Sequence, residues 1–252
     1  MEASVVGIDF AVGPSRFTFD LSNNNHPVTG AKPHVYFFSL HGFNALPAGN
    51  STAVYTSVGS PSAGGPSTGV YVTHTTFDQA GKWGAEIDVQ SGGKKRSLQT
   101  IFDVTAHSVT PAVGTAAPRS NNPTVSQEPV SKLDSGVPPD DMHRVSIAGA
   151  IARHRPLVVL FASSAYCGSF QCGPEIAAVQ SVERRFRSSV DFVHVDVFRN
   201  ARPSRLSTTA VQWRIRSQPW VFIVDRRGLI AAKFEGPAAA TELGQAVQRA
   251  SR

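Results

Sequence analysis

The chain contains very little cysteine and no long hydrophobic segment. Only two of its 252 residues are cysteines, Cys167 and Cys172, and this count does not decide between an oxidising and a reducing compartment. Nowhere do about 18 apolar residues follow one another, as a membrane-spanning helix would require. The N-terminus lacks the basic and apolar regions of a signal peptide. We therefore expect no membrane span, and either a cytoplasmic protein or one whose leader lies outside the given residues.

The sequence also lacks a single face on which basic residues are interleaved with exposed aromatics, the pattern that a nucleic-acid-binding surface would need. The formal net charge is +6, but the arginines fall at expected helix ends and turns. We therefore expect a solvated surface and no nucleic acid, with weak association with an anionic membrane surface as the alternative. The eight histidines show no pair with the spacing of a metal site on a helix or strand. Neither a metal nor another cofactor is expected.

The two cysteines lie between an expected strand and an expected helix. The apolar run Leu157–Phe161 precedes them and predicts a buried strand. Gly173-Pro174 follows Cys172, and proline is well tolerated in the first turn of a helix. Unpaired N–H groups at the start of a helix stabilise a thiolate and lower the pKa of the thiol, which makes a cysteine a usable nucleophile.

A structural disulfide, or a pair of unrelated buried thiols, is the competing interpretation. A bond between residues five positions apart closes a very short loop and constrains the unfolded chain little. Because such a bond adds little stability, we favour redox chemistry. The pair can bond only if its Cα atoms lie within about 7 Å of each other. We therefore expect the helix to begin at or after Cys172, with residues 168–171 in an irregular, partly exposed loop.

Residues 1–107 have the pattern of an all-β domain. Alternating apolar and polar residues, separated by turns rich in Gly, Pro, Asn and Ser, predict about seven short strands and no helix. Such regular spacing is typical of a β-sandwich. The clearest expected strands are 17–21, 34–38, 69–77, 83–89 and 98–104.

Residues 108–140 contain scattered prolines and show no apolar periodicity. Such a segment buries too little surface to offset the entropy of ordering it, so we expect an extended, semi-flexible linker. Residues 141–252 alternate helical and strand patterns and predict an α/β domain. The expected helices are 146–152, one after Pro174, 208–215 and 241–250, the last capped by Thr241. The expected strands are 157–161, 190–197, 220–224 and 230–234.

Residues 141–252 resemble the thioredoxin family. Cys172-Gly173-Pro174 is similar to the start of the thioredoxin Cys-Gly-Pro-Cys motif, and Phe161-Ala162 precedes the thiol loop. Ser217-Gln218-Pro219-Trp220 lies where the family has its cis-proline, and residues 233–236 resemble the end of its fourth strand. The resemblance implies a thioredoxin fold and a cis Gln218–Pro219 bond. It also implies that a substrate peptide lies beside the sulfurs, held by Tyr166, Gln218 and Pro219.

The stretch 77–83 resembles a turn in the immunoglobulin-like domains of bacterial envelope proteins. Envelope thioredoxin-like proteins with a β-sandwich in front and a Cys-x4-Cys-Gly-Pro site behind are similar to the whole chain. This likeness implies an immunoglobulin-like sandwich over residues 1–107 and an extracytoplasmic location. A cytoplasmic location is the alternative.

Several positions depart from the thioredoxin pattern. The cysteines are separated by four residues rather than two, and Glu175 stands where the family's second cysteine would follow Gly-Pro. The buried acid of thioredoxins aligns near Leu160, and Tyr166 replaces a tryptophan. Alignment through Gly-Pro makes Cys172 the attacking thiol, whereas distance from the strand makes it Cys167, which we favour.

Together these features predict a thiol–disulfide oxidoreductase that acts on protein or small-molecule disulfides through Cys167 and Cys172. A thiol peroxidase, in which the second cysteine resolves a sulfenic acid, is one alternative. A copper-binding assembly chaperone is another, with the cysteines and His194 as ligands, and a non-enzymatic binding module of the envelope is a third. Outside that alternative, His194 is expected to be a histidine with satisfied hydrogen bonds or one at the edge of the sheet.

Overall fold

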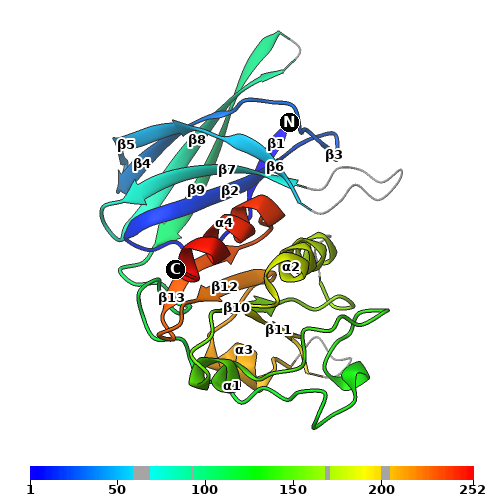
Figure 1. Ribbon diagram of the computed structural model, residues 1–252. Helices are drawn as coiled ribbons and strands as arrows, with labels where there is room; N and C mark the ends of the chain where they lie inside the picture. The colour runs from blue at the N-terminus through cyan, green and yellow to red at the C-terminus, as the bar shows by residue number, and fades with distance from the viewer. Residues whose placement is uncertain (59–68, 92, 168–170, 200–204) are drawn as a thin grey trace. The chain divides into compact units, whose positions relative to one another are not determined.

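The computed structural model describes residues 1–58, 69–91, 93–167, 171–199 and 205–252 (Figure 1). Strands make up most of its secondary structure, accompanied by a few helices. The chain divides into two compact units. The first unit comprises the described residues up to Ser57 and those from Gly69 to Ser108, and the second contains Val109–Arg252.

The first unit consists of two antiparallel sheets. One has the strand order β1-β2-β7-β6, with β3 paired to β2, and the other has the order β5-β4-β8-β9. The first sheet contains β1 (Glu2–Val5), β2 (Gly13–Asn23), β3 (His26–Pro27), β6 (Val54–Ser57) and β7 (Gly69–Phe77). The second contains β4 (His34–His41), β5 (Asn44–Thr52), β8 (Gly81–Ser91) and β9 (Lys94–Val104).

Side chains from both sheets form one apolar core in the first unit. In β8, Trp83, Ala85 and Ile87 are buried, whereas Glu86 and Asp88 are only partly buried. Successive side chains of a strand point to opposite faces, so this alternation turns one face of the sheet toward the core. The expected alternation of apolar and polar residues is therefore present in this strand.

The second unit is built on a four-stranded sheet with the order β11-β10-β12-β13. Strands β10 and β11 are parallel, and β12 and β13 continue the sheet in antiparallel pairing. The strands are β10 (Leu157–Phe161), β11 (Asp191–Val195), β12 (Trp220–Val224) and β13 (Ile230–Glu235). The helices are α1 (Ile147–Ala152), α2 (Cys172–Phe186), α3 (Thr208–Gln212) and α4 (Ala240–Ala250), with a short 3-10 helix, η1 (Val130–Lys132).

Helices cover both faces of this sheet (Figure 1). Val158 and Leu160 of β10 belong to a core cluster with side chains of α2 and α4. Leu157, Val159 and Phe161 of the same strand belong to a second cluster with side chains of α1 and α3. Because both faces are covered, every residue of β10 is buried, as its continuous apolar sequence predicted.

Residues 109–140 differ from the expected linker, because they pack into the second unit. Hydrogen bonds to the ends of helices and to a turn hold this segment in place, although its polar composition predicted an extended chain. The side chain of Asn122 accepts from the backbone N–H of Ile147 at 2.8 Å, and Ser120 Oγ accepts from Trp213 Nε1 at 3.2 Å. Ala117 pairs its N–H with the carbonyl of Gly228 at 2.9 Å. Sequence periodicity detects apolar faces, and it does not detect a segment ordered by such contacts.

Several element ends also differ from the sequence predictions. Strand β11 and helix α3 are shorter than expected. Helix α4 begins at Ala240, so Thr241 lies inside it, and the N-cap residue, Ala239, makes no side-chain cap. In contrast, Ser146 caps α1 by accepting from the N–H of Gly149. Among the described residues, no helix combines the length and apolar character that crossing a membrane requires.

Candidate functional site

Cys167 and Cys172 form a disulfide, with their Cα atoms 6.1 Å apart. This confirms the prediction that the pair lies within bonding distance. Strand β10 ends at Phe161, and α2 begins at Cys172 itself, which confirms the expected start of the helix. The irregular loop was predicted over residues 168–171, of which 168–170 lie outside the described residues.

The two sulfurs have different surroundings. Cys172 is 1% exposed and belongs to the core cluster beneath α2, whereas Cys167 is half-buried and packs against the edge of that cluster. At the start of a helix, unpaired N–H groups favour a negatively charged sulfur. The pair therefore combines one partly exposed cysteine with one that is held in the core at a helix start.

Two of the three residues predicted to receive a substrate, Tyr166 and Gln218, are joined by a hydrogen bond at the position before Cys167. The Gln218–Pro219 bond is cis, as predicted. The side-chain amide of Gln218 donates through Nε2 to the carbonyl of Tyr166 at 2.9 Å, which ties the segment before β12 to the residue preceding Cys167. The other amide atom, Oε1 of Gln218, is buried and has no hydrogen-bond partner among the described residues.

Glu175 is a buried acid that the sequence analysis noted only as a replacement for a cysteine. Its side chain is inaccessible to solvent, and Oε2 accepts from the backbone N–H of Ala238 at 2.7 Å. Glu175 shares the buried stripe of α2 with Ala178, Val179 and Val182. This spacing of i, i+3, i+4 and i+7 is the signal that could have placed the carboxylate inside the protein.

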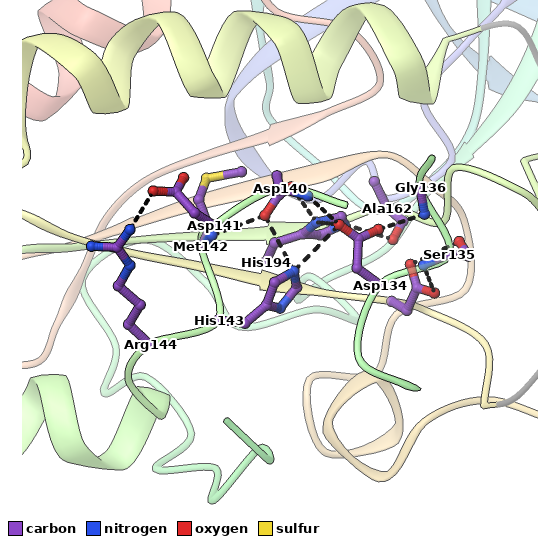
Figure 2. A network of polar contacts seen from close by, with 11 residues as sticks. Asp134, Ser135, Gly136, Asp140, Asp141, Met142, His143, Arg144, Ala162 and His194 are labelled. Carbon is purple, nitrogen blue, oxygen red and sulfur yellow. Dashed lines mark hydrogen bonds and ion pairs between the residues drawn. The ribbon is translucent and has the colours of Figure 1, made fainter. Parts of the chain in front are cut away.

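A second group of ionisable side chains lies in the interior of the same unit (Figure 2). We call it the His–Asp cluster, and it comprises Asp134, Asp140, His143 and His194. His194 Nδ1 lies 2.7 Å from Asp140 Oδ2. His143 Nε2 lies 3.2 Å from Asp140 Oδ1 and 3.4 Å from Asp134 Oδ2. The four side chains are between 0% and 3% exposed.

The electrostatics of the cluster are set by burial and by opposite charges. Burial alone would lower the pKa of His143, but the carboxylates of Asp134 and Asp140 outweigh it and raise the pKa to about 9. The pKa of His194 is also raised, chiefly by Asp140, against burial that would lower it. Burial would raise the pKa of Asp140, but hydrogen bonds and charge from the two histidines hold it well below its usual range.

The His–Asp cluster is connected to the segment that leads from β10 to Cys167. His194 donates through Nε2 to the carbonyl of Ala162 at 3.1 Å. Ser135, the neighbour of Asp134, accepts the N–H of Ala165 on its hydroxyl at 3.2 Å. Residues 162–165 are thus held from two sides by polar contacts.

Sequence reasoning found one member of this cluster. The two hydrogen bonds of His194 confirm the expectation that it is a satisfied histidine. Asp134, Asp140 and His143 were missed, the first two because they fell in the expected linker. Two carboxylates and an imidazole within ten residues of one another, in a segment without apolar pattern, were the available signal.

Comparisons with known proteins give matches among solved structures only. No protein-family model matches the chain, and no curated protein matches it. One similar structure is a thiol:disulfide interchange protein of the thioredoxin family from Chlorobium tepidum TLS, with 17% identity and a TM-score of 0.38. That match covers 57% of this chain and 97% of the other. Another is a thio-disulfide isomerase from Thermus thermophilus, with 21% identity and a TM-score of 0.30, covering 44% of this chain and 84% of the other. At these values, the activity of this chain has to be inferred from its own residues.

Proposed function

We propose that the protein is a thiol–disulfide oxidoreductase whose reactive pair is Cys167 and Cys172. The observation that carries this proposal is the asymmetry of a bonded cysteine pair at the start of a helix. One sulfur is half-buried at the edge of the core, and the other is 1% exposed at the first position of α2. An accessible sulfur next to a protected partner is the arrangement that exchange through a mixed disulfide needs.

In the reduced protein, the thiolate of Cys167 attacks a substrate disulfide. One substrate sulfur leaves as a thiolate that takes up a proton, and Cys167 becomes joined to the other in a mixed disulfide. The thiolate of Cys172 then attacks the Cys167 sulfur, which releases the second substrate thiol and forms the Cys167–Cys172 bond. Two electrons pass from the protein to the substrate, and an external dithiol returns them. Run backwards, the same steps oxidise a substrate dithiol.

We infer that a protein substrate docks beside Tyr166, Gln218 and Pro219. The hydrogen bond between Gln218 and the Tyr166 carbonyl brings the segment before β12 to the residue next to Cys167. A backbone segment bound along this edge would place its disulfide next to the half-buried sulfur. Substrates are accordingly expected among proteins with accessible disulfides or thiols.

We further propose that the second unit is a thioredoxin-like domain and the first an immunoglobulin-like sandwich. The second unit has the element succession β10-α2-β11-α3-β12-β13-α4 around the order β11-β10-β12-β13. In the first unit, the sheet β1-β2-β7-β6 has the order of strands A-B-E-D of an immunoglobulin domain. The sheet β5-β4-β8-β9 has the order of strands C-F-G, with one added strand beside C. In this proposal the second domain begins near Val109 and includes the segment first expected to be a linker.

We propose an extracytoplasmic location for the protein. Reactive cysteine pairs that exchange with protein disulfides have substrates mainly where disulfides form and persist. Fractionation of cells that produce the full-length protein tests this proposal.

A trapping experiment tests the proposed activity and shows which cysteine attacks the substrate. The reduced protein is mixed with a disulfide-linked peptide, and peptide thiol release is followed together with protein mass. The wild-type chain should release thiol and return to the internal disulfide. Cys172→Ser should accumulate a mixed disulfide on Cys167, because the resolving thiol is missing. Cys167→Ser should react far more slowly, because Cys172 is inaccessible.

Two controls accompany the trapping experiment. Ser164→Ala alters an exposed residue of the same segment and should exchange at the wild-type rate. The double variant Cys167→Ser/Cys172→Ser should keep the wild-type circular dichroism spectrum, because so short a loop contributes little stability. Exchange that persists in this double variant would contradict the proposal.

A further inference from the structure

The His–Asp cluster has the composition of a transition-metal site. Its ligand atoms, one from each of the four side chains, all lie within 4.8 Å of one another. Imidazole nitrogen and carboxylate oxygen are both ligands of zinc, at about 2.0–2.2 Å. We propose that the His–Asp cluster binds one divalent transition-metal ion of the zinc class, held by Nδ1 of His194, Nε2 of His143 and a carboxylate oxygen from each aspartate. This site uses neither cysteine and does not depend on the proposed thiol chemistry.

Charge balance in the interior supports a divalent ion. Asp134 and Asp140 place two negative charges where solvent does not reach, with side chains 2% and 3% exposed. Buried charges persist only when they are paired or bind a metal. Two protonated histidines would neutralise the pair, and so would one divalent cation with two neutral histidines. The cation gives the same net charge and adds bonds to all four side chains.

The ligand types select the kind of metal. Calcium and magnesium prefer oxygen ligands, usually supplemented by water. The cluster offers two imidazole nitrogens among its four ligand atoms, and imidazole suits zinc, copper, iron and nickel. All four side chains are nearly inaccessible, which matches the closed, four-ligand form of structural zinc sites.

The outer contacts of the cluster orient the ligands as metal sites require (Figure 2). A metal-bound histidine normally donates its other ring N–H to a carbonyl or carboxylate. His194 does so, donating through Nε2 to the Ala162 carbonyl at 3.1 Å, with Nδ1 directed at Asp140. The carboxylates are oriented by backbone N–H groups: Gly136 donates to Asp134 at 2.7 Å, and Met142 donates to Asp140 at 2.9 Å.

A cavity lies beside the cluster. It has a volume of about 760 Å³, and both His143 and His194 line it. Its wall also carries Glu128 and Asp196, together with three basic residues, Arg119, Lys132 and Arg199. A proposed metal site needs a path of access, and this cavity adjoins two of the four residues of the cluster.

Bound metal would link the segment from Asp134 to His143 to strand β11 through their shared ligation. It would also hold His194 against Ala162, at the start of the segment that leads to Cys167. The expected role is therefore structural, stabilising the second unit and the base of the thiol segment.

Metal binding is measured on the full-length oxidised protein. Among the described residues no cysteine is free, so thiolates do not compete for the ion. After treatment with a chelator and dialysis, zinc is added and binding is followed by calorimetry and elemental analysis. We expect one zinc ion per chain. Cobalt, added in place of zinc, should give the visible absorption bands of a four-coordinate nitrogen–oxygen site.

Substitutions of single histidines test whether the ion binds at the His–Asp cluster. His194→Ala should weaken zinc binding by more than about 100-fold, since loss of outer contacts alone typically costs 10–100-fold. His34→Ala is the matched control, because His34 also lies close to two side-chain oxygens, those of Thr52 and Asn50, but belongs to the first unit and is not one of the four proposed ligands. It should bind zinc as the wild type does.

A measurement on the wild-type chain tests the proposal even if His194→Ala fails to fold. The imidazole ¹⁵N resonances of His143 and His194 should shift when zinc is added, while that of His34 should not. Absence of zinc and cobalt binding by the oxidised wild-type protein would overturn the proposal and leave the cluster neutralised by protons. Undiminished binding in folded His194→Ala, or unshifted resonances, would overturn it as well.

Discussion

The two units of the chain bury different kinds of side chain. Among the described residues, the fully buried polar side chains of the first unit are hydroxyls only, those of Thr18, Ser39 and Thr73. The second unit buries five ionisable side chains: Asp134, Asp140, His143, Glu175 and His194. Burying charge costs free energy unless every group is paired. The two units therefore differ in that the second, and not the first, holds ionisable groups among its most deeply buried described side chains.

A pair of aspartates illustrates this difference. Asp20, in β2 of the first unit, has its pKa raised by burial to about 6. The pKa of Asp140, in the second unit, is held below its usual range, because the two histidines outweigh the effect of burial. Burial acts in the same direction on both carboxyl groups. For Asp140 the opposing effect comes from His143 and His194.

The largest expected effect is on the free energy of unfolding, and it distinguishes the core of the first unit from that of the second. Phe17→Ala removes a fully buried ring that packs against Phe37 and Phe102 at centroid distances of 5.2 and 5.3 Å. It should lower the free energy of unfolding of the first unit by about 3–5 kcal/mol. Thiol exchange by the second unit should be unchanged. Chemical denaturation, with exchange assayed in parallel, provides the measurement.

The matched variant Phe222→Ala removes a fully buried ring from β12 and should impair exchange together with stability. A loss of exchange in Phe17→Ala as large as that in Phe222→Ala would show that the chemistry is not confined to the second unit.

A smaller effect is expected at the buried acid of α2. Glu175→Ala leaves the N–H of Ala238 without its acceptor, a loss of about 1–3 kcal/mol for a buried group. Glu175→Gln keeps an oxygen that can accept this bond and should recover most of the lost stability. Thermal unfolding of the three proteins measures the difference. Equal destabilisation by both substitutions would mean that the hydrogen bond does not stabilise the helix start.

The smallest effect concerns pH and the first unit. Because the folded-state pKa of Asp20 is about 6 and thus above its ordinary value, folding favours the protonated carboxyl group. Its stabilising contribution is therefore present at low pH and is lost as the pH rises from about 4 through 6. Asp20→Asn should remove this dependence and raise the stability of the first unit at pH 7. Denaturation curves between pH 4 and 7 test the sign, and a variant less stable than wild type at pH 7 would contradict it.

The parts of the structure that follow from local pattern could be predicted from the sequence. The apolar run of β10, the alternation in β8 and the position of Cys172 at a helix start each depend on residues close together in the chain. The cis bond before Pro219 came from the resemblance to thioredoxins. These features need no knowledge of distant contacts.

The parts that depend on distant contacts could not be predicted. Asp134 and Asp140 meet His194 across more than fifty positions in the chain, so their spacing shows no pattern. Residues 109–140 were expected to be extended because they lack apolar periodicity, yet hydrogen bonds such as that between Asn122 and Ile147 order them. Glu175 was noted as a departure from the thioredoxin motif, but its burial depends on packing that the motif does not describe.

A redox titration of Cys167 and Cys172 tests the proposed activity most directly. The folded protein is equilibrated in glutathione buffers of graded composition, free thiols are alkylated, and the oxidised fraction is read from the mass. The account predicts a reversible two-electron transition above about −300 mV, the limit below which structural disulfides are typically found. Circular dichroism should stay constant throughout. A pair that remains oxidised until the protein unfolds would show that the disulfide is structural.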